Sequence, residues 1–412
     1  MKGEEIHMKG KVWKLLGLLS IVIFMLSIAG SVHAASLTST IKTGVGPIGV
    51  VYDPAVHEIF VDNYYGGDIQ VISDSTNQQV ADVTALTQYA GAPFNLAYDS
   101  VKGEIWVADA TGAYAISDAT NTIVANVSDT NGLELAAFDP STGEVFMSYS
   151  GNIAVISDST NTIIANITQS VTAMVDDSAK SEIFAATGSE GSAVVNVISA
   201  KTNAVTTTIS ISSAPDYLAY DSGKSEIFVA GSVLDSNTGL DTSNIQVISD
   251  STNKVVATID LPTSVSLGDM AYNPNKGEIY INDITSVAII SDSTNNVVGT
   301  LNTNGTNTYT GSDGIAYDSG TSTVYAINDG GSTEGFMGSL AVISDPSSGT
   351  STSNPTSTPT SSPGTSASTG STSTPKVPEF SNAALVSVGI AMIALTVSAV
   401  TLKARTKKSL QT

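Results

Sequence analysis

The chain has 412 residues, of which 41% are hydrophobic, and its formal net charge is -22 at pH 7. Such an acidic surface repels nucleic acid and anionic lipid, so we expect no nucleic-acid partner. There is no cysteine and there are only three histidines, which excludes disulfides, thiol catalysis and zinc sites of the Cys/His type.

Residues 1–34 have the composition of a secretory signal peptide. A basic stretch precedes an apolar run from Leu15 to Ala29, and Ala34 ends a small-residue cleavage site. Two glutamates near the beginning are unusual in such a leader, so Met8 is a second candidate for the true start. An uncleaved N-terminal anchor is the alternative interpretation.

From about residue 35 onward the chain repeats a phrase of the form hydrophobic-Ile-Ser-Asp-Ser-Thr-Asn. A truncated seventh copy, VISDP, begins at Val342. The spacing between copies is 40 to 50 residues, which is typical of propeller blades. The asparagines that close the six complete copies are Asn77, Asn121, Asn161, Asn203, Asn253 and Asn295.

A second phrase, close to Ala-Tyr-Asp-Ser-Gly-Lys-Ser-Glu-Ile-Phe-Val, precedes each copy. Turn residues flanked by alternating apolar positions predict two strands and their connection, so each unit comprises four strands, a to d. In the c–d turn, Asp158 and Asn161 offer oxygen ligands for calcium, but we expect them to shape the turn. The repeated glutamate that begins strand b, such as Glu104, is expected to be solvated.

Six d strands follow the six asparagines, whereas the strand at Val342 runs directly into a Ser/Thr/Pro tract. The segment SLTSTIKTG, from Ser36, carries the missing pattern. We therefore predict an all-β, seven-bladed β-propeller over residues 35–345, closed by its N-terminal strand. Closure removes the two open sheet edges that would otherwise favour aggregation.

The segment from Val247 to Ile259, VISDSTNKVVATI, resembles the consensus of the YVTN-type β-propeller repeats of archaeal and bacterial cell-surface proteins. The four letters YVTN of the family name correspond to the end of strand b, such as Phe60 to Asn63, although no strand b in this chain matches all four. The fourth repeat also departs from the consensus, with Ala200-Lys201 in place of Asp-Ser. The resemblance covers residues 36–345 and implies the fold and a cell-surface location rather than an activity.

Residues 346–378 are almost wholly Ser, Thr, Pro and Gly, a composition typical of an extended linker or stalk. An apolar stretch within residues 379–403 is long enough for a transmembrane helix. The basic tail, 404–412, predicts that this end is cytoplasmic and that the propeller lies on the extracellular side of the cell membrane. The tripeptide Pro378-Glu379-Phe380 resembles PEF-type sorting signals, in which the span is removed and replaced by a lipid; a permanent membrane anchor is the alternative.

Length differences between repeats fall in the b–c and d–a loops, which share one face of a propeller, and segment 231–244 is the longest such insertion. Variable loops on a rigid scaffold often carry binding residues. We therefore predict a recognition surface for cell-wall or surface-layer glycans or proteins, or for cations. The candidate contacts are Asp62, Tyr64, Tyr65, Tyr89, Asp109, Asp283 and Asp329.

We find no catalytic constellation, and therefore predict no catalytic residue, cofactor or metal; His57, in an a–b turn, is the one histidine beyond the leader. The predicted function is a surface binding, adhesion or surface-layer-associated module. One alternative is a lactonase- or lyase-type propeller enzyme whose channel mouth holds a metal on Asp62 and Asp283, and another is a structural coat protein. Sequons that predict N-glycosylation stand at Asn126, Asn166 and Asn304, the first two on d strands.

Overall fold

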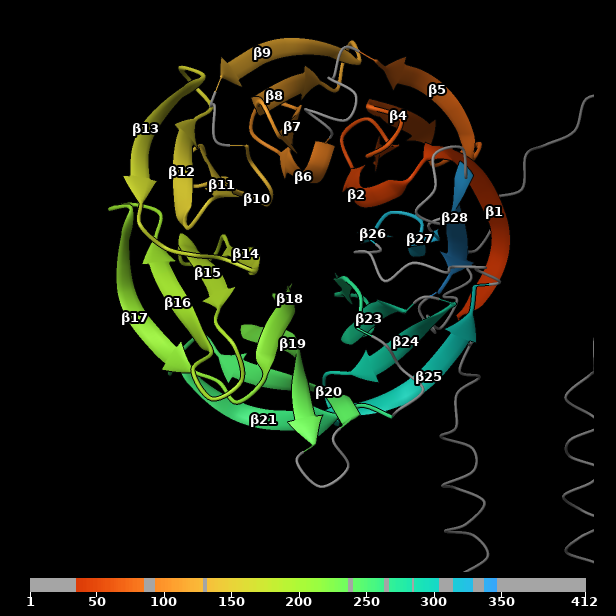
Figure 1. Cartoon of the computed structure of the whole chain (residues 1–412). Coiled ribbons are helices and arrows are strands. Elements are labelled where there is room, and N and C mark those ends of the chain that lie inside the picture. Colours follow the sequence, from red (N-terminus) through yellow and green to blue (C-terminus); the bar gives the residue numbers. More distant parts are fainter. Residues whose placement is uncertain are drawn as a thin grey trace, which may run out of the picture. The chain divides into compact units, whose positions relative to one another are not determined.

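A computed structural model describes residues 35–84, 93–128, 132–235, 240–262, 267–283, 285–303, 314–328 and 337–346. Every regular element in these ranges is a β-strand. The strands form seven antiparallel four-stranded sheets, which stand as blades around a common centre (Figure 1). The predicted seven-bladed β-propeller is confirmed, while the predicted leader, stalk, membrane segment and tail lie outside the described residues.

Each blade uses strands a, b, c and d from the centre outward, in the order of the chain except in blade 7. The a strands are β2 (Pro47–Asp53), β6 (Pro93–Asp99), β10 (Ala136–Asp139), β14 (Ala173–Asp177), β18 (Ala214–Asp221), β22 (Met270–Asn273) and β26 (Ile315–Asp318). The b strands are β3 (Glu58–Asn63), β7 (Glu104–Asp109), β11 (Glu144–Tyr149), β15 (Glu182–Thr187), β19 (Glu226–Asp235), β23 (Glu278–Asp283) and β27 (Thr323–Asn328). The c strands are β4 (Asp68–Ser73), β8 (Gly112–Ser117), β12 (Asn152–Ser157), β16 (Val194–Ser199), β20 (Leu240–Ser249), β24 (Ser286–Ser291) and β28 (Met337–Ser344). The d strands are β5 (Gln78–Val83), β9 (Thr122–Ser128), β13 (Thr162–Ile167), β17 (Ala204–Ser210), β21 (Lys254–Asp260), β25 (Asn296–Asn302) and, for blade 7, β1 (Ser36–Val45).

The N-terminal strand closes the ring, as predicted. β1 pairs antiparallel with β28, in a register that sets Ser36 opposite Ser344 and Ile41 opposite Leu340. In Figure 1 the two strands lie side by side, although they come from opposite ends of the propeller sequence. Blade 7 therefore has the same four strands as the other six.

The core lies between neighbouring blades, where the b strands pack their largest side chains. One aromatic residue from each b strand is almost completely buried, and these rings fill the space between sheets. They occupy one repeat position: Phe60, Trp106, Phe146, Phe184, Phe228, Tyr280 and Tyr325.

The repeated asparagine has the role in the turn that the sequence predicted. All six adopt the left-handed conformation, with φ between 51° and 54°. Asparagine tolerates this conformation better than other non-glycine residues, because its short amide can bond to the local backbone. The repeated Asn is thus explained by backbone geometry.

Each outer strand also carries a β-bulge at one position, opposite the middle of strand c. The extra residue is an exposed aliphatic one in five blades: Val80, Val124, Ile164, Val256 and Val298. A bulge bends the strand and disturbs its free edge, which hinders pairing with a second molecule. The bulges therefore protect the edges that ring closure leaves on the outside.

Two expectations need correction. The glutamates that begin strand b are half-buried, and Glu104, Glu144 and Glu226 each have a buried Oε2 without a hydrogen-bond partner among the described residues. Burial raises the pKa of all three carboxyl groups. The predicted loop 231–244 is largely a β-hairpin, because β19 and β20 stay paired from Gly231–Asn244 out to Asp235–Leu240.

Candidate ligand-binding site at the channel mouth

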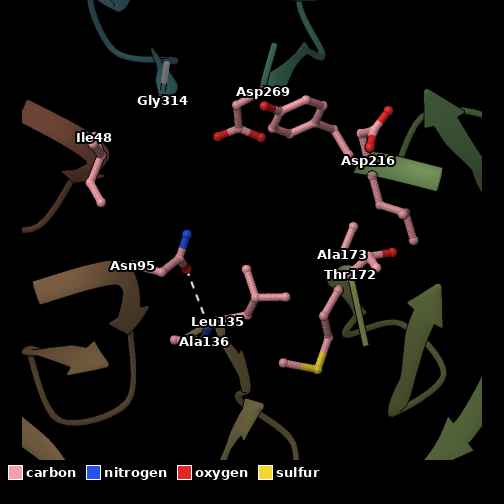
Figure 2. A pocket seen from close by; sticks show the side chains of 12 residues that line it. Ile48, Asn95, Leu135, Ala136, Thr172, Ala173, Asp216, Asp269 and Gly314 are labelled. Carbon is pink, nitrogen blue, oxygen red and sulfur yellow. Dashed lines mark hydrogen bonds between the residues drawn. The ribbon is translucent and has the colours of Figure 1, made fainter. Parts of the chain in front are cut away.

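A pocket of about 320 Å³ lies where the seven a strands begin, at the centre of the ring. Because d–a and b–c connections share one face of a propeller, this end of the channel opens on the face that carries the variable loops. We call it the mouth pocket (Figure 2). Each blade contributes at least one lining residue: Ile48, Asn95, Leu135, Thr172, Asp216, Asp269 and Gly314.

The lining differs from blade to blade, in contrast to the ends of the a strands, which follow the pattern Ala-Tyr-Asp with few departures. Apolar groups from Ile48, Leu135 and Met174 cover part of the wall, and Tyr217 adds an aromatic ring. Apolar side chains next to a few convergent polar groups are typical of small-ligand sites. The residues that are the same in every repeat thus build the scaffold, and the residues that differ between repeats line the pocket.

Two carboxylates, Asp216 of blade 5 and Asp269 of blade 6, line one side of the mouth pocket. Asp269 accepts a hydrogen bond from the Met270 amide at 2.8 Å and another from the amide of Ile315. Burial nevertheless raises the pKa of Asp269 to about 6, and burial also raises the pKa of Asp216. No lysine or arginine is among the lining residues. This side of the pocket can therefore accept hydrogen bonds from hydroxyl or ammonium groups.

Asn95 and Thr172 join neighbouring blades at the pocket wall. The Asn95 Oδ1 accepts a hydrogen bond from the Ala136 amide at 3.2 Å, and Thr172 Oγ1 lies 2.8 Å from the Pro215 carbonyl. Figure 2 shows the Asn95 amide nitrogen directed into the pocket. Asn95 thus offers a donor on the side opposite the two carboxylates.

Asp62, the first candidate from the sequence, has a different role from the predicted one. It is completely buried, and its Oδ1 accepts hydrogen bonds from the amides of Ile48 at 3.1 Å and Gly49 at 2.6 Å. Burial raises its pKa to about 7, with the two amides acting in the opposite direction. Asp62 therefore fixes the start of β2, from which Ile48 reaches the pocket.

Tyr64 and Tyr65 lie in the b–c turn of blade 1, where their rings meet edge to face with centroids 4.9 Å apart. Both are half-buried. A Cβ at Gly46 would fall 2.3 Å from the Tyr65 ring, and Gly46 has a φ of 62°. The close approach and the backbone conformation both require glycine at this position.

Asp109 and Asp283 also serve their own turns. The Asp109 Oδ1 accepts hydrogen bonds from the Thr111 amide and hydroxyl, at 2.8 and 2.7 Å, and Asp283 Oδ2 accepts one from Ser286 at 2.9 Å. They and Asp62 lie at the ends of the b strands of three different blades. Tyr89 and Asp329 lie outside the described residues.

Within the described part of the chain, no three His, Cys, Asp or Glu side chains gather in a way that could hold a metal ion. Nor do the described residues include a helix long and apolar enough to cross a membrane. Among the sequons, Asn126 and Asn166 are exposed on β9 and β13, while Asn304 lies outside the described residues.

The chain matches no protein-family model, and no curated protein matches it. Solved structures resemble its fold. Kuenenia stuttgartiensis hydrazine synthase aligns with a TM-score of 0.57 and 16% identity, over 70% of this chain and 94% of that one. A chain of the mitotic checkpoint complex aligns with a TM-score of 0.60 and 11% identity, over 75% and 91% of the two chains. The Cps50 (Swd1) β-propeller domain of Myceliophteria thermophila gives 0.60 and 11%, over 76% and 99%. At these identities the likeness establishes the propeller fold alone.

Proposed function

We propose that this protein is a cell-surface binding module of the YVTN-type repeat class, which holds part of a cell-wall or surface-layer glycan in its mouth pocket. The observation that carries the proposal is the pocket itself. Its wall combines apolar side chains with Asp216, Asp269 and the Asn95 amide, and sugar rings present both apolar faces and hydroxyl groups.

The direction of the chain supports a role at a surface. β28 runs from the b–c side of blade 7 to its c–d side, so the described chain ends, at residue 346, on the face opposite the mouth pocket. A stalk over 346–378 and an anchor over 379–403 would then continue the chain from that face. The acidic composition and the sequons fit such a location.

The test is binding of the purified protein to a glycan array and to isolated cell envelopes. The variants Asp216→Asn and Asp269→Asn remove charge but keep the size of each side chain, and Asp260→Asn, on the exposed end of β21, is the matched control. We expect either pocket variant to weaken binding roughly tenfold, because hydrogen bonds to a charged group contribute about 1.5–3 kcal/mol. Binding that both pocket variants retain in full would exclude this site, and an absence of glycan binding by the native protein would remove the proposed function.

A further inference from the structure

A lysine of an a–b turn reaches across several junctions between blades, on the face opposite the mouth pocket. At the junction of blades 5 and 6, the Lys224 ammonium lies 3.6 Å from the carboxylate of Asp292, the residue after strand c. At the junction of blades 6 and 7, the Lys276 ammonium contacts the Oδ1 of Asp345, the equivalent residue directly after β28. The side chain of Lys224 is 37% exposed, whereas that of Lys276 is 15% and that of Asp345 is 1% exposed. The pair between blades 6 and 7 is therefore the more completely shielded from water.

Two neutral groups hold the other oxygen of Asp345. The Asn273 Nδ2 donates a hydrogen bond to this Oδ2 at 3.2 Å, and the Tyr280 hydroxyl donates a second one to the same atom. Asn273 Nδ2 also lies 3.1 Å from the Tyr280 hydroxyl. The carboxyl group of Asp345 thus presents Oδ1 to an amine and Oδ2 to two hydrogen-bond donors. Donors placed at one carboxyl oxygen stabilise the negative charge that develops there when a nucleophile attacks the carbon.

The junction of blades 5 and 6 has the lysine but lacks both donors. The turn residue in the position of Asn273 is Asp221, and its carboxylate faces that of Asp292. The core residue in the position of Tyr280 is Phe228, which has no polar atom to donate. A second carboxylate would repel a developing negative charge, whereas an amide stabilises it. The arrangement around Asp345 is therefore not a consequence of the repeat alone.

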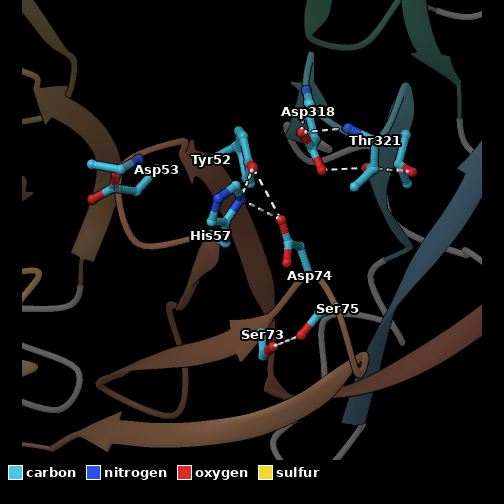
Figure 3. Close-up of polar contacts among 11 residues, drawn as sticks. Tyr52, Asp53, His57, Ser73, Asp74, Ser75, Asp318 and Thr321 are labelled. Atoms are coloured by element: carbon cyan, nitrogen blue, oxygen red, sulfur yellow. Dashed lines mark hydrogen bonds and ion pairs between the residues drawn. The ribbon is translucent and has the colours of Figure 1, made fainter. Parts of the chain in front are cut away.

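The junction of blades 7 and 1 lacks the lysine instead (Figure 3). Thr321 takes its position, and the threonine hydroxyl bonds to Asp318 within its own turn. The counterpart of Asp345 is Asp74, whose Oδ2 lies 3.0 Å from the Tyr52 hydroxyl and 3.2 Å from His57 Nδ1. A phenol and an imidazole thus face this carboxylate in place of an amine.

Glu278, the first residue of β23, can carry protons between the groups of the pair. Its carboxyl group hydrogen-bonds to that of Asp345 and interacts electrostatically with the Lys276 ammonium. The Glu278 Oε2 also lies 3.2 Å from the Tyr280 hydroxyl. Burial raises the pKa of Glu278, and the charge of Asp345 raises it further. A carboxyl group with a raised pKa can accept and return a proton near neutral pH, as general acid–base catalysis requires.

We propose that Lys276 and Asp345 condense to an amide bond, which links blade 6 covalently to blade 7. Transfer of one proton within the ion pair gives a neutral amine and a carboxylic acid. The lone pair of Lys276 Nζ then forms a bond to Asp345 Cγ, while Oδ2 takes the negative charge beside its two donors. Glu278 accepts a proton from Nζ and returns it to Oδ1, so that the Cγ–Oδ1 bond breaks and water leaves. An ammonium and a carboxylate thus become one amide and one water molecule, and no other reactant is needed.

The position of the pair favours the reaction and gives it a consequence. The fold holds the amine and the carboxyl group in contact, so the bond forms within one molecule and without the entropy cost of an encounter. The amide would tie the a–b turn of blade 6 to the end of β28, the strand on which β1 closes the ring. Tension on a stalk that begins at residue 346 would therefore reach a covalent bond before it reached the hydrogen bonds of blade 7.

The test is peptide mapping of the purified full-length chain by mass spectrometry. We expect one branched peptide that contains both Lys276 and Asp345, lighter than the sum of its two parts by one water molecule. Trypsin should not cut after Lys276, because its amine is no longer free. Recovery of Lys276 and Asp345 in two separate, unmodified peptides would overturn the proposal, since the pair would then be an ion pair only.

Substitutions test the role of each group in the reaction. Lys276→Arg keeps the positive charge but should abolish the link. Glu278→Gln should reduce the linked fraction at least roughly tenfold, whereas Glu226→Gln, at the equivalent position of blade 5, is the matched control and should keep it. Asn273→Asp, which introduces the turn residue of the other six blades, should reduce linkage to a similar extent. Full linkage in Glu278→Gln or Asn273→Asp would remove that residue from the mechanism, and a branched peptide in Lys276→Arg would contradict the assigned nucleophile.

Discussion

The ammonium of Lys180 in blade 4 lies 3.2 Å from a carboxylate oxygen of Asp250 in blade 5, and it also donates a hydrogen bond to the Asp250 carbonyl at 2.7 Å. The carboxylate side chain is only 1% exposed, whereas the lysine is 38% exposed. Because a buried carboxylate that loses its counter-ion is costly, this pair bears on the stability of the junction between the two blades.

We expect Lys180→Met to lower the free energy of unfolding by about 1–3 kcal/mol. This loss is smaller than for a fully buried ion pair, because the ammonium is partly hydrated. Chemical denaturation of the purified protein measures the effect. Lys201→Met, an exposed lysine in the same blade, is the control and should change stability by less than about 0.5 kcal/mol. Equal effects of the two substitutions would mean that the contact with Asp250 contributes nothing.

The left-handed turn asparagines predict an unusual order of substitutions. At Asn161, where φ is 53°, glycine should be tolerated within a few tenths of a kcal/mol, whereas alanine should cost about 1 kcal/mol. Asn152→Ala on β12, which has an ordinary backbone, is the comparison. A higher denaturation midpoint for Asn161→Ala than for Asn161→Gly would contradict the assignment of a left-handed turn residue.

Ring closure can be tested with a disulfide, since the chain has no cysteine of its own. Ser36 and Ser344 are Cα partners in the β1–β28 ladder. The double variant Ser36→Cys/Ser344→Cys should form a disulfide under oxidising conditions. It should be stabilised by up to about 4–5 kcal/mol relative to its reduced form, because the closed loop is long. Mass spectrometry would detect the bond, and free thiols after oxidation would argue against the pairing.

Ligand binding at the mouth pocket should depend on pH. Asp269 has a pKa of about 6, so its carboxylate is ionised above this pH and protonated below it. If the bound group donates hydrogen bonds to Asp269, affinity should fall roughly tenfold between pH 7 and pH 5. Isothermal titration calorimetry at both pH values measures this fall, which Asp269→Asn should abolish. If the affinity of the native protein does not change with pH, Asp269 is not one of the residues that contact the ligand.

The architecture could be predicted almost completely from the sequence, because each repeat carries its own turn signals. Six copies ended in an Asn that must be left-handed, and the missing outer strand of the seventh was recognisable in SLTSTIKTG. The hairpin of β19 and β20 was mistaken for a loop, since Gly231 and the Ser/Thr/Asn-rich sequence resemble turn chemistry.

The candidate site was harder to predict. Asp62, Asp109 and Asp283 end their strands and so resemble exposed contacts, but backbone amides and hydroxyl groups nearby use their oxygens. Asp216 and Asp269 each lie in a non-repeated segment, and nothing local distinguishes them from ordinary loop residues. Their importance arises from ring geometry, which brings the starts of seven distant strands to one point. Variation between the repeats, four and five residues before each a–b turn, was the signal that could have identified them.

The pairing of β1 with β28 also determines when the propeller can be completed. Thr38 donates a hydrogen bond to the Val342 carbonyl, and these residues are 304 positions apart. A chain delivered from its N-terminus, by a ribosome or through a membrane pore, releases β1 first and β28 last. Blades 1 to 6 can form in succession, but the first strand must wait, unpaired, for the last. Completion of the ring is therefore a single late event. A chain that is interrupted before residue 337 would keep two unpaired strand edges, which can pair with a second molecule.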